Sequence, residues 1–473
     1  LQTPSDSSRD WTVFVERVGM LLFFCGMWTT RFIAVPGFLL MMLGLCANFS
    51  QVKDKLLSST VCMLAILWVA YNVVSAFIFA AIYPEYWYEQ LNQGLRFVYL
   101  SGFIFLALGF NRHPDLIWPA IFLSFAGFFL TRLFYILLLF MEGQSITQSR
   151  PDLGLHTAIA MGQYSFFALM ALVLFLSRSL GQRRRVLRFG IWAMFFAFSC
   201  FLILISKSRS TWLLLPFFLP SLLLAMVLIK KLSWARFGLI ASVLSLTGIL
   251  IFQGYSDQIV NRLETESETL DQIFAGDLRN IAAATESGRV KSIGVRVAMI
   301  RYGLNEWSEN PIFGLGPGAT KMLLDCCSPE EFKHLNDLHS FVPEMLLRTG
   351  LVGFALLLAL NILIFRQVVS AYRSGRLPGE LMLFIIFGLA LHWALALGNF
   401  RMVNYDWRAY WFMLAGLAAA YSFDPKIHQK QTPAATRKLE SAQSEDSLVF
   451  QPIDNGSNPG VDERQAISPQ RDF

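Results

Sequence analysis

Arginines that lie beside apolar segments are the residues in this sequence best suited to chemistry. Arg209 lies in "SKSRSTW" at the start of one apolar run, and Lys207 comes two residues before it. Arg296 and Arg301 lie in "GVRVAMIRYGLNEWSEN", where apolar residues recur at helical spacing. A guanidinium group is planar, permanently charged and bidentate, so it suits phosphate oxygens better than an ammonium group does. These cations are therefore candidates for binding a phosphate group.

His339 is the histidine whose position best suits proton transfer. It lies in "NDLHSFVPEM", directly before another apolar run, where it could act as a general base at the boundary of that run. A helix-capping or structural role is the alternative. A metal pair with His334 is disfavoured, because a spacing of five residues puts the side chains on different helix faces and no carboxylate cluster completes a site. We therefore expect no metal ion.

The composition is that of an integral membrane protein. Of the 473 residues, 55% are hydrophobic and only 15% are charged, whereas about 25% of a soluble domain is charged. A net charge of +6 would suggest a nucleic-acid partner in a soluble protein. Here the basic residues lie mostly in short loops between apolar runs, so we attribute the charge to membrane topology and expect no nucleic-acid partner.

Apolar runs recur along most of the chain, and a helix needs about 20 such residues to cross a bilayer. On that rule we expect an all-α polytopic membrane protein with about twelve transmembrane helices. The expected spans are 12–30, 32–49, 57–82, 95–110, 115–140, 157–177, 189–205, 210–229, 236–253, 341–365, 381–400 and 407–423.

The spans divide the chain into four parts. Residues 1–253 are expected to form the first nine spans, 254–340 one large helical loop, and 341–423 the last three spans. The loop is expected to contain an amphipathic helix at 255–274 and a second helix at 294–310, which ends at "NPIFGLGPG". The remaining residues, 424–473, have almost no apolar periodicity and are expected to form a disordered tail.

Lysine and arginine are concentrated in the even-numbered loops, such as 53–55, 177–188 and 230–236. Because short cytoplasmic loops carry an excess of these residues, we place the even loops and both termini, including the tail, in the cytoplasm. The large loop 254–340 then lies outside the cytoplasm. The first apolar run is interpreted as a retained helix, because no small-residue cleavage site follows it.

This topology puts the four cations named above on the outer side, where positive charge opposes correct insertion. Arg401, Asp406 and Arg408 flank the short outer loop before the last span. Each arginine could simply extend to lipid head groups, and these last three residues could pair with one another. The functional alternative is that several arginines converge on an anionic group, such as a lipid-linked diphosphate.

Three separated segments together resemble the O-antigen ligase/polymerase superfamily. They are "SKSRSTW" (206–212), "GVRVAMIRYGLNEWSENPIFGLGPG" (294–318) and "LHSFVPEMLLRTGLVGFALLL" (338–358). The resemblance implies a GT-C-like fold with a large periplasmic loop. It also implies a glycosyltransferase that uses neither a metal ion nor another cofactor and inverts the anomeric carbon.

The resemblance also implies roles for single residues. Arg209 and Arg296 match the arginines thought to hold the donor diphosphate, and His339 matches the catalytic histidine that helps to deprotonate the acceptor hydroxyl. Ser340 stands where many relatives have Asn. The possible supporting residues are Lys207, Arg301, Asp406 and Arg408.

The expected reaction moves a glycan from undecaprenyl diphosphate to a lipid A–core acceptor, at the periplasmic face of the bacterial inner membrane. An O-antigen or exopolysaccharide polymerase, which uses the same donor, is the alternative; the long single loop before His339 favours a ligase. A twelve-span transporter is a distant alternative, because two related halves are not visible in the sequence. Cys326 and Cys327 are adjacent, and we expect no disulfide between them because bonds between neighbours are rare.

Overall fold

The computed structural model describes residues 4–28, 31–143, 153, 158–180, 185–235, 237–238, 241–242, 253, 292–328, 333, 337–397 and 405–423. Helices joined by turns make up these ranges, and they contain no strand. The prediction of an all-α fold is therefore confirmed. The tail 424–473 and the expected helix at 255–274 lie outside the described residues.

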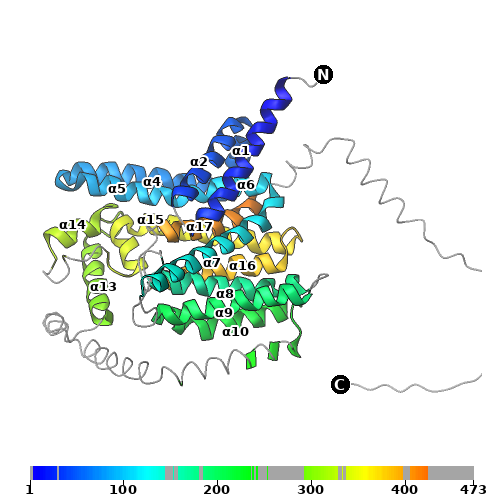
Figure 1. Ribbon diagram of the computed structural model, residues 1–473. Helices are drawn as coiled ribbons and strands as arrows, with labels where there is room; N and C mark the ends of the chain where they lie inside the picture. Colours follow the sequence, from blue (N-terminus) through cyan, green and yellow to red (C-terminus); the bar gives the residue numbers. More distant parts are fainter. Residues whose placement is uncertain are drawn as a thin grey trace, which may run out of the picture. The chain divides into compact units, whose positions relative to one another are not determined.

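The first part of the chain is a series of helices joined by short turns (Figure 1). In chain order they are α1 (Pro4–Gly26), α2 (Arg31–Ala47), α3 (Phe49–Ser58), α4 (Thr60–Ile82), α5 (Trp87–Val98), α6 (Phe103–Arg112) and α7 (Ile117–Met141). The backbones of α1 and α2 approach closely, because Gly19 and Gly37 leave no side chain between them. A Cβ atom on Gly37 would overlap the backbone of α1.

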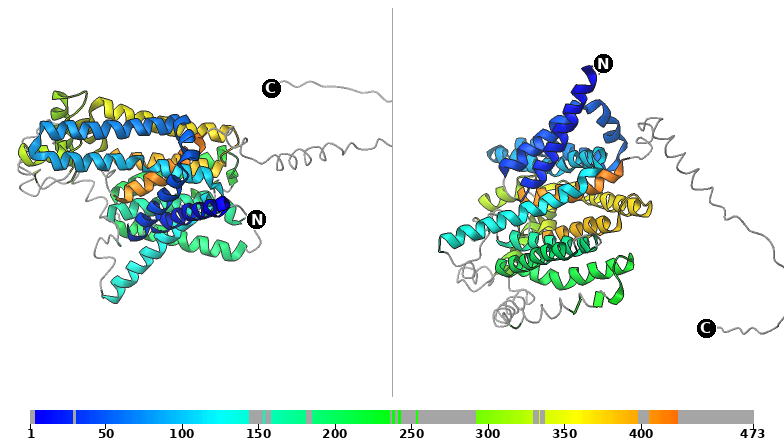
Figure 2. Two further views of the ribbon diagram at one scale, coloured as in Figure 1. Left: turned by 90° about the horizontal axis from the view of Figure 1, so that it is seen from above. Right: turned by 45° about the vertical axis from the view of Figure 1, so that its right-hand side comes forward.

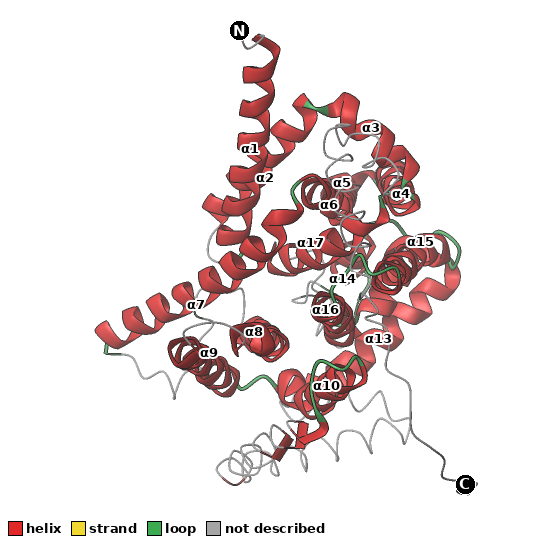
Figure 3. Ribbon diagram, turned by 90° about the vertical axis from the view of Figure 1, so that its right-hand side faces the viewer, coloured by secondary structure: helices red, strands yellow, loops and turns green. Residues whose placement is uncertain are grey.

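The helices α8 (Ala158–Leu180), α9 (Arg185–Ser206) and α10 (Arg209–Leu228) form the next group. Figure 3 shows them beside α16 (Gly379–Leu397), and α8 packs against all three of its partners in this group. Phe384 on α16 stacks on Phe167 of α8, with 5.0 Å between the ring centroids. Aromatic contacts of this kind make up much of the interior between these helices.

A third group surrounds the long helix α15 (Phe341–Arg373), which packs against α4; α4 in turn packs against α5 (Figure 2). Two further helices, α13 (Ser292–Glu309) and α14 (Ala319–Cys326), lie at one end of these three (Figure 1). The helix expected at 294–310 is thus present as α13. The last helix, α17 (Tyr405–Ala419), packs against α6 and α16.

Helices occupy the expected span ranges up to residue 229 and again from 341 onward, whereas 236–253 lies mostly outside the described residues. By length and composition, seven described helices could cross a membrane, or eight if the bent pair Arg31–Ala47 and Val52–Ser58 counts as one. The number twelve is therefore not confirmed. The expected spans 57–82 and 95–110 imply a connecting loop at 83–94, and that prediction is wrong, because most of this segment is helical and forms the first part of α5.

Candidate functional site

Asp337 connects two of the residues that the sequence singles out. Its Oδ1 atom lies 2.9 Å from Nδ1 of His339 and accepts a hydrogen bond of 2.8 Å from the backbone N–H of the same residue. These contacts stabilise His339 at a φ of +53°, a left-handed conformation that is uncommon for a residue with a side chain. The histidine therefore occupies a tight turn directly before α15.

The contact with Asp337 defines how the imidazole can act. In the neutral ring, a proton on Nδ1 can be donated to the carboxylate, which leaves Nε2 with a lone pair. Both side chains are partly exposed, at 32% for His339 and 24% for Asp337, so the ring is reachable from outside. This arrangement is that of a histidine base oriented by an acid.

Arg296 lies on α13, and the charge of Asp337 acts on it as well. Burial lowers the pKa of the Arg296 guanidinium, and the negative charge of Asp337 opposes that change. An arginine stays protonated under such conditions, so it contributes a fixed positive charge. The carboxylate that pairs with His339 thus also acts on Arg296, although 42 residues of sequence lie between the two.

The turn that carries His339 is fixed from two sides. The N–H of Leu338 donates a 2.7 Å hydrogen bond to Oε2 of Glu344, one turn into α15. The Leu338 side chain packs directly on Gly303 of α13, where a Cβ atom would overlap it. Gly303 is therefore needed for close packing between the helix of Arg296 and the turn of His339.

Glu344 belongs to a buried polar network that the sequence reasoning missed. Its Oε1 accepts a 2.7 Å hydrogen bond from Thr320 on α14 and forms an ion pair with Arg348 one turn later. Arg348 also donates to Thr320 at 3.1 Å and to Gln93 of α5 at 3.3 Å. Glu344 and Arg348 are almost completely buried, so each needs the other. A carboxylate and an arginine four residues apart in an apolar run were the visible signal.

The segment "PIFGLG" docks on a break in α15. At Gly350 the backbone has φ +61° and ψ −171°, so the helix loses its regular hydrogen bonds there. Leu315 donates instead to the carbonyl of Leu347 at 2.9 Å, and Leu351 donates to Pro311 at 2.9 Å. A Cβ atom on Gly350 would overlap the carbonyl oxygen of Ile312. Glycine is therefore required where the two backbones exchange hydrogen bonds.

We refer to residues 311–318, "PIFGLGPG", as the glycine segment, and Gln90 of α5 binds it as well. Its Oε1 accepts a 2.7 Å hydrogen bond from the N–H of Gly318, and its Nε2 lies 3.4 Å from the carbonyl of Leu315. The side chain is completely buried. Together with Gln93, it ties α5 to the segments that carry Arg296 and His339.

The hairpin between α9 and α10 is organised by its hydroxyl groups. The Oγ of Ser206 accepts a hydrogen bond of 3.2 Å from the N–H of Ser208, and Thr211 donates to the Oγ of Ser208 at 3.0 Å. These three side chains are buried against Gly162 of α8. Lys207 sits in this hairpin with a φ of +48°.

Arg209 is the first residue of α10. Its backbone is described, but its side chain lies outside the described atoms. Its convergence with Arg296 on one anion therefore stays a prediction.

Residues 192–358 match the family model described as O-Antigen ligase. This match over about a third of the chain supports the O-antigen ligase superfamily. The matched range includes the hairpin, α13, the glycine segment and the turn of His339. A comparison with curated proteins gives no match.

The supporting residues expected for an O-antigen ligase lie on several elements. Arg301 is exposed on α13, and Lys207 is half-buried in the hairpin. Arg408 is half-buried in the first turn of α17, with its guanidinium 5.2 Å from the ring centre of Tyr99. Asp406 lies in the same helix turn, but its side chain is outside the described part of the structure.

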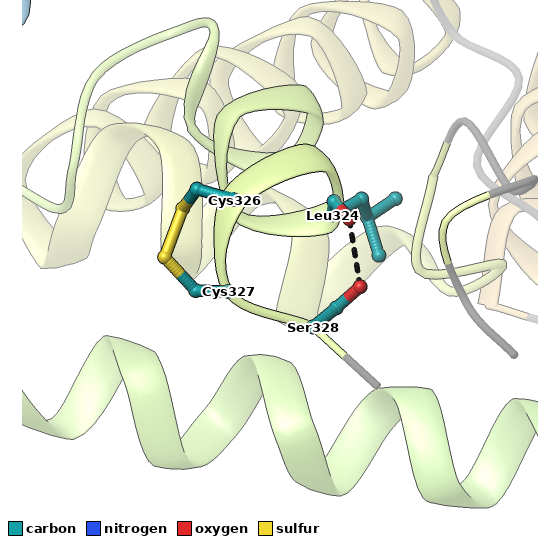
Figure 4. Close-up of a disulfide and its surroundings, with 4 residues drawn as sticks. All are labelled: Leu324, Cys326, Cys327 and Ser328. Carbon is teal, nitrogen blue, oxygen red and sulfur yellow. Dashed lines mark hydrogen bonds between the residues drawn. A yellow bond between two sulfur atoms is a disulfide. The ribbon is translucent and has the colours of Figure 1, made fainter. Parts of the chain in front are cut away.

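The O-antigen ligase domain also contains a disulfide between Cys326 and Cys327 at the end of α14 (Figure 4). The expectation of no bond was wrong. That expectation relied on the rarity of disulfides between neighbouring cysteines, and the sequence contains no other signal for this bond. Beside the disulfide, Ser328 donates a 2.7 Å hydrogen bond to the carbonyl of Leu324. Among the described residues, no group of three or more His, Cys, Asp or Glu could hold a metal ion.

Proposed function

We propose that this protein is an O-antigen ligase that moves a glycan from undecaprenyl diphosphate to a lipid A–core acceptor. The observation that carries the proposal is Asp337, which pairs with His339 and acts electrostatically on Arg296 inside the matched domain. A glycosyl transfer needs a base for the acceptor hydroxyl and positive charge for the leaving diphosphate. The two partners of Asp337 supply one of each.

His339 acts on the acceptor. Its Nε2 accepts the proton of the sugar hydroxyl as the oxygen attacks the anomeric carbon, and the new C–O bond forms on the face opposite the leaving group. The imidazolium that results is stabilised by the carboxylate of Asp337 at 2.9 Å. Because the sugar diphosphate is already activated, this modest base is sufficient.

Arg296 and Arg209 act on the donor. As the bond between the anomeric carbon and the phosphate oxygen breaks, its electron pair remains on undecaprenyl diphosphate. Fixed guanidinium charges stabilise that developing negative charge, a task that many glycosyltransferases assign to a divalent ion. Lys207 and Arg301 add positive charge on the same two elements. The proposed reaction is therefore independent of metal ions and inverts the anomeric centre.

The proposed site faces the periplasm of the bacterial inner membrane. The disulfide Cys326–Cys327 lies on α14, next to the segments of the site. Disulfides persist in oxidising compartments, which include the periplasm, and are rare in the cytoplasm. The disulfide therefore supports the orientation that the basic loops indicate.

An in vitro transfer assay tests this function. Purified protein is supplied with a lipid-linked glycan and, in separate reactions, with lipid A–core or a second lipid-linked glycan as acceptor. We expect transfer to lipid A–core, unchanged by EDTA, and loss of transfer in His339→Ala. Transfer only to the second lipid-linked glycan would identify a polymerase instead. No transfer to either acceptor would contradict both assignments.

A further inference from the structure

Three arginines outside the segments of the proposed active site lie close together. Arg31 begins α2, Arg96 lies in the last turn of α5, and Arg408 lies in the first turn of α17. The positive charges of Arg31 and Arg96 both act on the guanidinium of Arg408. Because like charges repel, three neighbouring arginines are electrostatically unfavourable without an anion. We refer to these three residues as the arginine cluster.

Two tyrosines hold the cluster in place. The guanidinium of Arg408 lies 5.2 Å from the ring centre of Tyr99, and that of Arg31 lies 5.2 Å from the ring centre of Tyr405. Tyr99 follows Arg96 by three residues, and Arg408 follows Tyr405 by three. Each tyrosine thus lies three residues from one arginine of the cluster and contacts another. Cation–π contacts orient the guanidinium planes but leave their charge and their N–H donors available.

In the part of the chain that the structure describes, the arginine cluster lacks the carboxylate counter-charge that some other arginines have. Across the described ranges, no carboxylate forms an ion pair with any of its three members. In contrast, Arg17 pairs with Asp115, and the buried Arg348 pairs with Glu344. The Nε atom of Arg408 is buried and has no hydrogen-bond partner within the described part of the chain. A buried N–H donor without a partner costs free energy, and a bound anion would satisfy it.

We propose that the arginine cluster binds a phosphate group of a lipid substrate. A phosphate offers more acceptor oxygens than the two of a carboxylate, so it can accept hydrogen bonds from guanidinium groups on three different helices. Arg31 and Arg408 also lie in first turns of helices, where the helix dipole adds positive potential. The inference rests on the proposed function, because a reaction between two lipid-anchored glycans presents phosphate on both substrates. The phosphate belongs to the donor diphosphate or to the lipid A of the acceptor.

A binding experiment with full-length protein in detergent tests the cluster directly. The probes are a short-chain prenyl diphosphate, lipid A, and lipid A without its phosphate groups. The variants are Arg96→Gln, Arg408→Gln and Arg96→Lys. The lysine variant keeps the positive charge but loses the planar, bidentate guanidinium group. Arg366→Gln is the matched control, because Arg366 is exposed on α15 and far along the chain from the cluster. Melting without ligand shows whether each variant is folded.

We expect the dissociation constant for one phosphorylated probe to rise about tenfold or more in both glutamine variants, because each loses a charged hydrogen bond. Arg96→Lys should lie between them and the wild type, and Arg366→Gln should match the wild type. The probe that responds identifies the source of the phosphate. Lipid A without phosphate should bind all variants alike.

Wild-type affinity of both glutamine variants for both phosphorylated probes would overturn the proposal. Equal weakening of the phosphate-free lipid would also overturn it, because the cluster would then not recognise phosphate. The transfer assay separates this outcome from the proposed function. A wild-type protein that binds the probes through the cluster but transfers no glycan would contradict the ligase assignment alone.

Discussion

Asp337 acts on two candidate site residues of different kinds, a histidine and an arginine. The carboxylate orients the imidazole of His339 and acts electrostatically on Arg296. An imidazolium formed during proton transfer and a permanently charged guanidinium would otherwise repel each other. A carboxylate between them lowers that repulsion and keeps both groups near one reaction centre.

Replacing Asp337 by Asn tests this role. The amide keeps the size of the side chain but cannot stabilise the imidazolium, so we expect transfer turnover to fall by about 10²- to 10⁴-fold. Steady-state kinetics with varied donor and acceptor measure the change. The melting temperature should stay near that of the wild type because Asp337 is partly exposed. Turnover within twofold of the wild type would remove Asp337 from the mechanism.

Glu344 and Arg348 allow a matched comparison with an exposed ion pair. Both Glu344–Arg348 and Lys321–Asp325 are spaced by four residues, but the first pair is buried and the second is partly exposed. Glu344→Gln leaves Arg348 buried without its counter-charge, which costs about 3–5 kcal/mol. Asp325→Asn should cost less than about 1 kcal/mol.

Thermal unfolding in detergent measures both variants of this comparison. We expect a large decrease in melting temperature for Glu344→Gln and almost none for Asp325→Asn. Because Glu344 also holds the N–H of Leu338, turnover at a temperature where the variant is folded should fall as well. Equal melting temperatures for the two variants would contradict the role of the buried network.

At the scale of elements, the break in α15 determines how the glycine segment docks. Gly350 and Gly375 both have positive φ, at +61° and +71°, but only Gly350 has neighbouring atoms within contact distance of a new Cβ. Gly375→Ala should cost about 1 kcal/mol, from backbone strain alone. Gly350→Ala adds the overlap with the carbonyl of Ile312, so we expect about 3 kcal/mol or more and loss of transfer.

The pair Gly350→Ala and Gly375→Ala is compared by thermal unfolding and by transfer. The hydrogen bonds from Leu315 and Leu351 should be lost in the first variant and unaffected in the second. A Gly350→Ala protein as stable and active as Gly375→Ala would show that the break does not require glycine.

The helices could be predicted from the sequence because lipid-facing segments are apolar along their whole length. The motifs also predicted that Arg296 and His339 act together, and in the structure Asp337 pairs with His339 and acts electrostatically on Arg296. Asp337, Gln90 and Gln93 were missed, since their importance comes from contacts between distant segments. Gln90, for example, is completely buried and accepts a hydrogen bond from Gly318, which lies 228 residues further along the chain. The helix α5 was interpreted as a loop because its polar residues resemble those of a connection.

At the scale of the whole molecule, α15 relates the candidate site to the membrane. The site lies at its beginning, and the part from Leu351 to Arg373 is regular helix. At 1.5 Å per residue this part is about 35 Å long, enough to cross a hydrocarbon core of about 30 Å. The site and Arg373 should therefore lie on opposite sides of the membrane.

Labelling of single cysteines tests this topology. Asn305 on α13 and Arg373 are both exposed, and each is replaced by Cys in a Cys46→Ser background, because Cys46 is exposed as well. Cys326 and Cys327 are bonded to each other and should not react. A membrane-impermeant maleimide added to intact spheroplasts should label Asn305→Cys at once. It should label Arg373→Cys only after the membrane is permeabilised. The reverse pattern would place the site in the cytoplasm, where a periplasmic glycan transfer could not occur.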